Sequence, residues 1–204
     1  MLSLKPYRLL FTLFLFDIFS QNHACNQIHR DSLLSLAFNH MSSSPLNWSS
    51  IDCCQWEGIS CDHKHQVTHI WLPSKGISGS LSPSLGNLTH LSHLNLSHNS
   101  LSGPLPMGVF SSLNQLKVLD LSYNHLFGDI FGWPASIQIV DISSNHFSET
   151  IQFSSLQRAW RLIELNVSNN SFMGSIPHFL ASILPLLSSL ISPITNIVAK
   201  FLAD

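Results

Sequence analysis

The sequence predicts an α/β-type solenoid with short parallel strands on a concave face and a helical, disulfide-stapled cap at its N-terminus. Three observations predict this fold. One leucine-rich motif recurs five times within 204 residues. Four cysteines cluster ahead of it, and a stretch with helical spacing lies among those cysteines. The 9 basic and 11 acidic residues form no like-charge block. This composition argues against nucleic acid as a partner, because binding phosphates needs clustered Lys and Arg.

The recurring motif has the form L-x-x-L-x-L-x-x-N. Its clear copies begin at Leu91, Leu116 and Leu162, and looser copies begin at Val67 and Ile137. A period in the twenties with this pattern is the leucine-rich repeat. We therefore expect about five repeats over residues 67–179. Arrays of this kind bind partners more often than they catalyse reactions, so we expect no enzyme activity and no cofactor.

The alternating L-x-L part of each repeat predicts a short strand with leucines inward and the x residues outward. The ninth position then turns inward, where an Asn amide can bond backbone groups of neighbouring turns. It is Lys75 in the first repeat and Asn in the other four: Asn99, Asn124, Asn145 and Asn170.

The outward positions form the candidate binding face. The alternative for any single position is an ordinary solvated surface. Trp71 and Tyr123 are the strongest candidates, because exposed aromatic side chains supply much binding energy. The set comprises His69, Trp71, His93, Asp120, Tyr123 and Glu164, accompanied by Thr68, Ser92, Asn95, Lys117, Val118, Gln138, Asp141 and Asn166.

Residues 1–24 have the layout of a secretory signal peptide. Lys5 and Arg8 form a basic start, an apolar run covers residues 9–20, and small residues lie near Ala24. The run is short for a membrane span, so an uncleaved anchor is the less favoured alternative. We therefore expect the chain in the secretory pathway and at the cell surface or outside the cell.

Residues 25–66 precede the repeats and predict a cap. An even number of cysteines in an oxidising compartment indicates two disulfides among Cys25, Cys53, Cys54 and Cys61. Adjacent cysteines rarely bridge each other. Of the remaining pairings we favour Cys25–Cys53 with Cys54–Cys61. A zinc site is the alternative, but the C-x-x-C spacing is missing.

Apolar residues at helical spacing predict a helix over residues 31–38, with Asp31 or Ser32 as its N-cap. Trp48 and Trp56 are expected to cover the exposed apolar end of the first repeat. A ligand platform is the alternative for the two tryptophans.

Other chemistry in the chain is sparse. His90 and His93 form an H-x-x-H pair, but residues three apart on a strand point to opposite faces, so we expect no metal site there. Five N-x-S/T sequons are candidate glycosylation sites in a secreted chain. They are Asn47, Asn87, Asn95, Asn166 and Asn169.

Several segments together resemble a known family. After the Asn, the repeats read L-x-G-x-I/L-P, as in Leu-Ser-Gly-Pro-Leu-Pro106, and the cap contains Asp52-Cys-Cys-Gln-Trp-Glu-Gly-Ile-Ser-Cys61. With Arg30-Asp-Ser-Leu-Leu, Pro45-Leu-Asn-Trp and Asn166-Val-Ser-Asn-Asn-Ser-Phe, residues 25–179 resemble plant leucine-rich-repeat receptor-like kinase ectodomains. Within that family they resemble the group that binds tyrosine-sulfated peptides and phytosulfokine. The resemblance implies a secreted peptide or protein ligand and a co-receptor as partners.

Residues 180–204 depart from the repeat. A sixth copy of the motif should start near Leu187, yet Pro193 lies in the expected strand, where it cannot donate a backbone hydrogen bond. Reading the codons of residues 190–202 one nucleotide earlier allows a regular repeat, which indicates a frameshift between Pro177 and Leu190. A membrane-anchoring tail is the alternative, because residues 178–199 are uncharged with neutral His.

The family's kinase motifs are missing as well, so we expect a truncated receptor ectodomain. The other functions that fit the sequence are a free-standing secreted repeat protein, acting as a defence-type inhibitor or decoy, and a membrane-anchored receptor-like protein.

Overall fold

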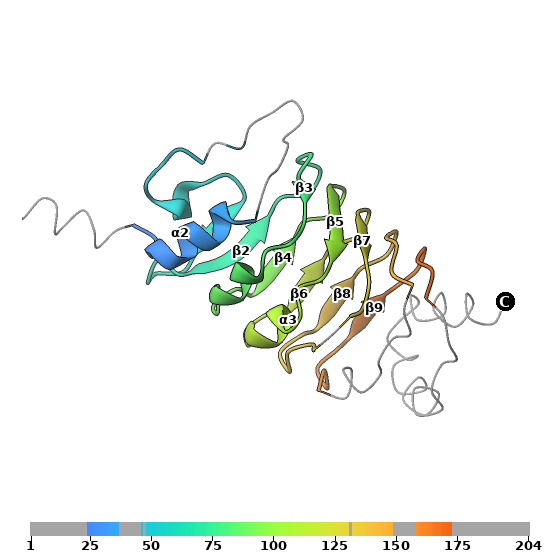
Figure 1. The fold of residues 1–204 in the computed structure, drawn as a ribbon. Helices are drawn as coiled ribbons and strands as arrows, with labels where there is room; N and C mark the ends of the chain where they lie inside the picture. Colours follow the sequence, from blue (N-terminus) through green and yellow to red (C-terminus); the bar gives the residue numbers. More distant parts are fainter. Residues whose placement is uncertain (1–23, 37–45, 47, 131, 149–157, 173–204) are drawn as a thin grey trace, which may run out of the picture.

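The computed structural model describes residues 24–36, 46, 48–130, 132–148 and 158–172. Within them the chain winds into a solenoid whose main sheet runs from the cap toward the last described repeat (Figure 1). The expected signal peptide and the 180–204 tail lie outside these residues. Among the described residues, no helix has the length and hydropathy needed to cross a bilayer.

The main sheet has six strands in the order β1-β2-β4-β6-β8-β9. Strand β1 pairs antiparallel with β2. All later neighbours are parallel, as the repeat predicted, and they are in register. The strands are β1 (Ile59–Cys61), β2 (Val67–Trp71), β4 (His93–Asn95), β6 (Val118–Asp120), β8 (Ile139–Asp141) and β9 (Glu164–Asn166).

A second, three-stranded parallel sheet lies beside the first and was not predicted. It consists of β3 (Ser78–Gly79), β5 (Ser100–Pro104) and β7 (His125–Phe127). A bridge between Phe127 and His146 extends the same ladder by one repeat. This sheet uses the Leu-x-Gly-x part of each repeat. Gly103 in β5 has φ +93°, which L side chains rarely adopt, so glycine is required there.

Leucines stacked between the two sheets form the core. The middle residues of β4, β6 and β8 are buried: Leu94, Leu119 and Val140. Leu96 and Leu121, two residues further along the chain, are buried as well. Each such side chain contributes roughly 1.5–3 kcal/mol by leaving water. Two short helices lie between strands of successive repeats: η2 (Pro83–Asn87) between β3 and β4, and α3 (Val109–Ser112) between β5 and β6.

The inward Asn residues form a hydrogen-bonded ladder, as predicted. The Asn124 Oδ1 accepts from the Leu101 N–H at 3.0 Å, and its Nδ2 donates to the carbonyls of Leu96, Leu121 and Ser122. Asn99, Asn145 and Asn170 make equivalent bonds one repeat apart. One side chain type thus satisfies the backbone groups that each turn aims at the core.

The cap contains helix α2 (Gln27–Leu34) and the short helix η1 (Cys53–Gln55). The predicted helix start at Asp31 or Ser32 is wrong. Asn26 is the N-cap, and its side chain accepts from the Ile28 N–H at 2.8 Å. The helix begins earlier because Asn26 offers a better-placed capping oxygen than Asp31, which lies inside the helix and bonds Gln27 instead.

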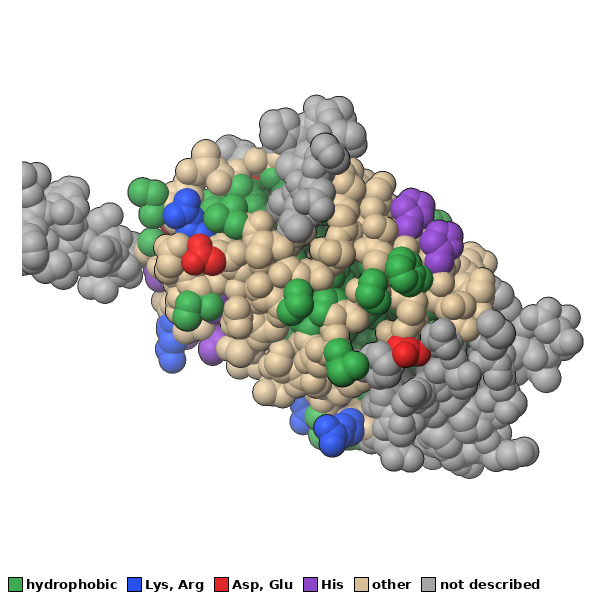
Figure 2. Space-filling model, viewed as in Figure 1, with side chains coloured by type: hydrophobic (Ala, Val, Ile, Leu, Met, Phe, Trp, Pro, Cys, Tyr) green, Lys and Arg blue, Asp and Glu red, His purple; other side chains and the backbone are tan. Residues whose placement is uncertain are grey.

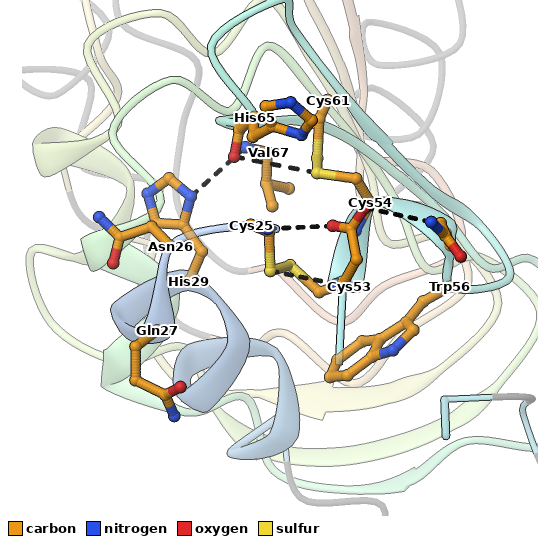
Figure 3. Close-up of a disulfide and its surroundings, with 12 residues drawn as sticks. Cys25, Asn26, Gln27, His29, Cys53, Cys54, Trp56, Cys61, His65 and Val67 are labelled. Atoms are coloured by element: carbon orange, nitrogen blue, oxygen red, sulfur yellow. Dashed lines mark hydrogen bonds between the residues drawn. A yellow bond between two sulfur atoms is a disulfide. The ribbon is translucent and has the colours of Figure 1, made fainter. Parts of the chain in front are cut away.

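Two disulfides hold the cap together, Cys25–Cys53 and Cys54–Cys61, in the pairing that we favoured (Figure 3). Trp56 is 2% exposed, and its indole N–H donates to the Ser50 carbonyl. Trp48 stacks on Trp56 with ring centroids 4.8 Å apart. Trp56 thus belongs to the hydrophobic core that the cap shares with the repeats, and Trp48 packs against that core. Trp56 is therefore not an open platform.

Candidate functional site

The outward positions of the main sheet lie in straight rows because its parallel strands are in register. One row runs through His69, His93, Val118, Ile139 and Glu164. The next row runs through Trp71, Asn95, Asp120, Asp141 and Asn166. Five of the six principal candidates, all except Tyr123, therefore share one continuous face. A partner on that face would meet side chains from every repeat.

The end of this face nearest the cap carries aromatic rings. Trp71 on β2 is 56% exposed. His69 and His93 stack with ring centroids 4.4 Å apart and an interplanar angle of 9°. Burial, followed by the positive charges of His69 and Lys117, lowers the pKa of His93. This end presents flat surfaces that suit contact with aromatic, apolar or planar groups.

The middle of the face carries a row of amides and carboxylates held in place by hydrogen bonds. The Asn95 Nδ2 donates to Asp120 Oδ2 at 3.0 Å, and the Asn166 Nδ2 donates to Asp141 Oδ2 at 3.0 Å. Asp120 and Asp141 are register partners on β6 and β8. Two carboxylates therefore stand side by side at the centre, a place suited to a cationic or donor-rich group.

Serines two positions later fix these side chains from behind. The Asp120 Oδ1 accepts from both the N–H and the hydroxyl of Ser122, at 3.0 and 2.7 Å. Asn95, Asp141 and Asn166 accept the same pair of bonds from Ser97, Ser143 and Ser168. These bonds hold the four side chains in fixed orientations, so a ligand would meet side chains that are already oriented.

Tyr123 does not lie on a strand. It follows β6 in a left-handed conformation with φ 54°, is 52% exposed, and stacks on His98 with ring centroids 4.2 Å apart. The same position is left-handed in all five repeats: Ser74, His98, Tyr123, Ser144 and Asn169. Tyr123 and His98 thus form a second aromatic pair at the rim of the face, and the part played by His98 was not predicted.

The sequons lie in different surroundings. Asn87 and Asn169 are exposed. Asn95 was expected to face outward, but it is 6% exposed, because its amide is held by Asp120 between neighbouring strands. Asn166 is half-buried with its amide on Asp141, and Asn47 lies outside the described residues. A glycan at Asn95 or Asn166 would have to replace a hydrogen bond of the carboxylate row.

The described residues contain one group of three potential metal ligands, Asp52, Cys54 and His65. The sulfur of Cys54 is bonded to Cys61, so no thiolate is available there. His90, the other half of the expected H-x-x-H pair, precedes β4, apart from the row that contains His93. Charged side chains are few and scattered on the view in Figure 2.

Three protein-family models match the sequence. "Leucine rich repeat N-terminal domain" matches residues 30–62, and "Leucine rich repeat" matches residues 79–126 and again 161–183. These ranges agree with the structural cap and with the repeats that carry β4 to β6 and β9.

Similar proteins come from plants. The chain is 50% identical to Receptor-like protein 3 of Arabidopsis thaliana over 81% of this chain, and 37% identical to Phytosulfokine receptor 1 of the same plant over 59%. It spans only 24% and 12% of those proteins. The Arabidopsis receptor kinase HAESA ectodomain, solved with a peptide hormone, superposes with a TM-score of 0.62 at 33% identity, over 76% of this chain and 26% of that one.

Proposed function

Because this chain belongs to the leucine-rich-repeat ectodomains of plant receptor-like proteins and receptor-like kinases, we propose that its concave face binds a secreted peptide or protein ligand. The observation that carries the proposal is the unbroken row from Trp71 to Asn166, in which serines hold the polar groups in fixed orientations. An exposed Trp beside fixed polar groups is the composition of a binding hot spot.

The aromatic end of the face and the carboxylates at its centre define the ligand. Trp71 and the stacked His69 and His93 would receive an aromatic or apolar residue, while Asp120 and Asp141 would accept from a Lys, an Arg or an amino terminus. Adjacent outward residues of an extended peptide could reach both. The proposed ligand is thus a short extended segment with a large apolar residue and a basic group.

We place this binding outside the cell. Two disulfides are stable in an oxidising compartment, and the relatives are receptor-like proteins. The proposal includes a cleaved signal peptide over residues 1–24 and glycans at the exposed Asn87 and Asn169. The relative at 50% identity, Receptor-like protein 3, favours a receptor-like protein over a receptor for phytosulfokine, which is the ligand named for the relative at 37%.

A peptide-display selection against the secreted, disulfide-bonded chain tests this function. Binders should be enriched in an aromatic residue near a basic residue. Trp71→Ala should weaken them at least about thirtyfold, because losing a hot-spot aromatic costs about 2 kcal/mol or more. Met107→Ala is the matched control, since Met107 is 82% exposed and lies outside the main sheet. Binders that ignore Trp71→Ala and Asp120→Ala but lose affinity in the control would contradict the proposal.

A further inference from the structure

Two imidazole rings near the cap are arranged in a way that peptide binding does not require. His69 on β2 and His93 on β4 are register partners, half-buried and stacked. A hydroxyl from the residue just before each histidine contacts its Nδ1 atom. The hydrogen-bonding of those hydroxyls determines which ring nitrogen is left with a lone pair.

The hydroxyl beside His93 fixes the proton position on that ring. Ser92 Oγ donates to the Thr68 carbonyl at 2.9 Å and lies 2.8 Å from His93 Nδ1. A hydroxyl has one hydrogen, and the carbonyl can only accept. Both contacts are therefore satisfied when His93 Nδ1 carries a hydrogen and donates to Ser92. Neutral His93 then has its lone pair on Nε2.

The same arrangement recurs one strand earlier. Thr68 Oγ1 donates to the Ser60 carbonyl at 3.2 Å and lies 2.9 Å from His69 Nδ1. His69 is thereby placed in the same tautomer as His93. Since the rings are stacked within 9° of parallel and both are held through Nδ1, the two Nε2 lone pairs stand side by side.

We propose that His69 and His93 bind a divalent transition-metal ion of the Zn²⁺ type through their Nε2 atoms. Imidazole nitrogen suits Zn²⁺, Ni²⁺ and Cu²⁺. Metal-ligating histidines characteristically donate their other ring N–H to an oxygen, which sets the tautomer and orientation, and here Ser92 and Thr68 supply those oxygens. With two protein ligands, the remaining positions are open to water or to a donor group from a bound partner.

The geometry needs one adjustment. Zn–N bonds are about 2.0–2.1 Å long, so a shared ion requires the two rings to tilt toward each other from their 4.4 Å stack. Rotation about the χ2 bond of histidine is soft and provides that tilt. The hydroxyl partners can be kept, because each hydroxyl oxygen has two lone pairs with which to accept the Nδ1–H.

Neighbouring charges make a specific signature for this site. Lys117, which directly precedes β6, acts on His93 through its positive charge and would also repel a bound cation. Removing Lys117 should therefore tighten metal binding. An anionic ligand on the same histidines would respond in the opposite way, because Lys117 would attract it. The sign of the Lys117 effect separates the two.

The chain offers its own control pair. His125 and His146 also stack, with ring centroids 5.6 Å apart, and both are exposed at the edge of the second sheet. Among the hydrogen bonds of the described residues, none reaches the ring nitrogens of this second pair. Histidines gather at that edge in Figure 2. Stacking alone, without the hydroxyl partners, is thus represented in the same molecule.

Isothermal titration of the intact, tag-free chain with ZnCl₂ and NiCl₂ at neutral pH tests the proposal. We expect saturable binding of one ion per chain. His69→Gln and His93→Gln should each weaken it at least about tenfold, the loss typical even for outer partners of a metal site. Lys117→Gln should tighten it, and the double variant His125→Gln/His146→Gln should bind as the unaltered chain does. Far-UV circular dichroism checks that each variant is folded.

Histidine ¹⁵N NMR gives a readout that needs no variant. Both His69 and His93 should show hydrogen on Nδ1 without metal, and their Nε2 resonances should shift on Zn²⁺ addition. Binding that survives both histidine variants, or no saturable binding up to millimolar Zn²⁺, would overturn the site. Saturable sulfate binding that depends on Lys117, without Zn²⁺ binding, would assign the pair to an anionic group instead. None of these measurements involves a peptide, so they leave the proposed function separately testable.

Discussion

The cap and the repeats of this molecule are held together in opposite ways. The cap uses two covalent links and contacts that each occur once, such as the Trp56 indole N–H on the Ser50 carbonyl. The repeats use one contact many times, the inward Asn that bonds three carbonyls and one N–H. A repeated sequence can rely on one side chain, whereas an irregular end of a solenoid needs staples.

Removal of the long-range disulfide tests the cap half of this comparison and should have the largest effect. Cys25–Cys53 spans 28 residues and Cys54–Cys61 spans 7. Loop-closure entropy predicts a loss of about 3.5 kcal/mol for Cys25→Ser/Cys53→Ser and about 2.5 kcal/mol for Cys54→Ser/Cys61→Ser. Urea unfolding of both variants measures the difference. Equal losses would mean that local packing, not loop length, decides what each staple contributes.

Asn124→Ala tests the repeat half. It leaves the buried Leu101 N–H without its acceptor. The carbonyls of Leu96 and Leu121 lose one donor but keep another, from Asn99 and Asn145 respectively. One unsatisfied buried group costs about 1–3 kcal/mol, so we expect a loss of about 2 kcal/mol in the free energy of unfolding. The exposed Asn114→Ala is the matched control. A loss below about 1 kcal/mol, less than one unsatisfied group costs, would show that water or a shifted backbone replaces the ladder.

The same contrast explains what could be predicted from the sequence. The strands, the Asn ladder and most of the concave face could be predicted because five copies reinforce one another. The helix start could not be predicted, because Asn and Asp are both residue types that favour the N-cap position, and both Asn26 and Asp31 were available. The N-terminal cap of the solenoid occurs only once, so no second copy could decide between them. Tyr123 was placed on the face, but its left-handed backbone moves it to the rim.

Parts of the candidate site were missed although a signal existed. An Asn or Asp followed two residues later by Ser occurs in four repeats, and it forms the row of fixed amides and carboxylates. The burial of Asn95 follows from that row, since its amide bonds a side chain on the next strand. Cross-strand partners of this kind need the register, which the shorter interval between the repeats at Leu116 and Ile137 left open.

A buried histidine in the cap and a half-buried one in the repeats should make stability depend on pH. Burial, followed by the charge of His90, lowers the pKa of His29 in the cap, although Asp62 opposes this, and burial lowers that of His93 in the repeats. Both values lie below the ordinary 6.5, so the folded state binds fewer protons than the unfolded chain. Stability is therefore complete above about pH 6.5 and declines as the pH falls below it.

Urea titrations between pH 7.5 and pH 5 measure this dependence. His29→Gln and His93→Gln should each flatten the slope of unfolding free energy against pH more than the matched variant of the exposed His125, His125→Gln. If His29→Gln flattens the slope and His93→Gln does not, proton linkage belongs to the cap alone, and the two halves differ in a further respect.

The junction between cap and repeats should show the smallest effect. Lys75 stands at the ladder position of the first repeat and forms an ion pair with Glu57 of the cap, while its backbone N–H donates to Asn99. Both side chains are more than one-third exposed, so Lys75→Ala should cost less than about 1 kcal/mol. At 1 M salt the Debye length falls to about 3 Å and the cost should shrink further.

A double-mutant cycle with Glu57→Gln, using the exposed Lys64→Ala as a charge-matched control, isolates the pair. A coupling energy well above the roughly 1 kcal/mol that exposed ion pairs reach would mean that this ion pair stabilises the junction substantially. Disulfides in the cap and hydrogen bonds in the repeats would then not account for the stability of the molecule without a third contribution, the ion pair that joins them.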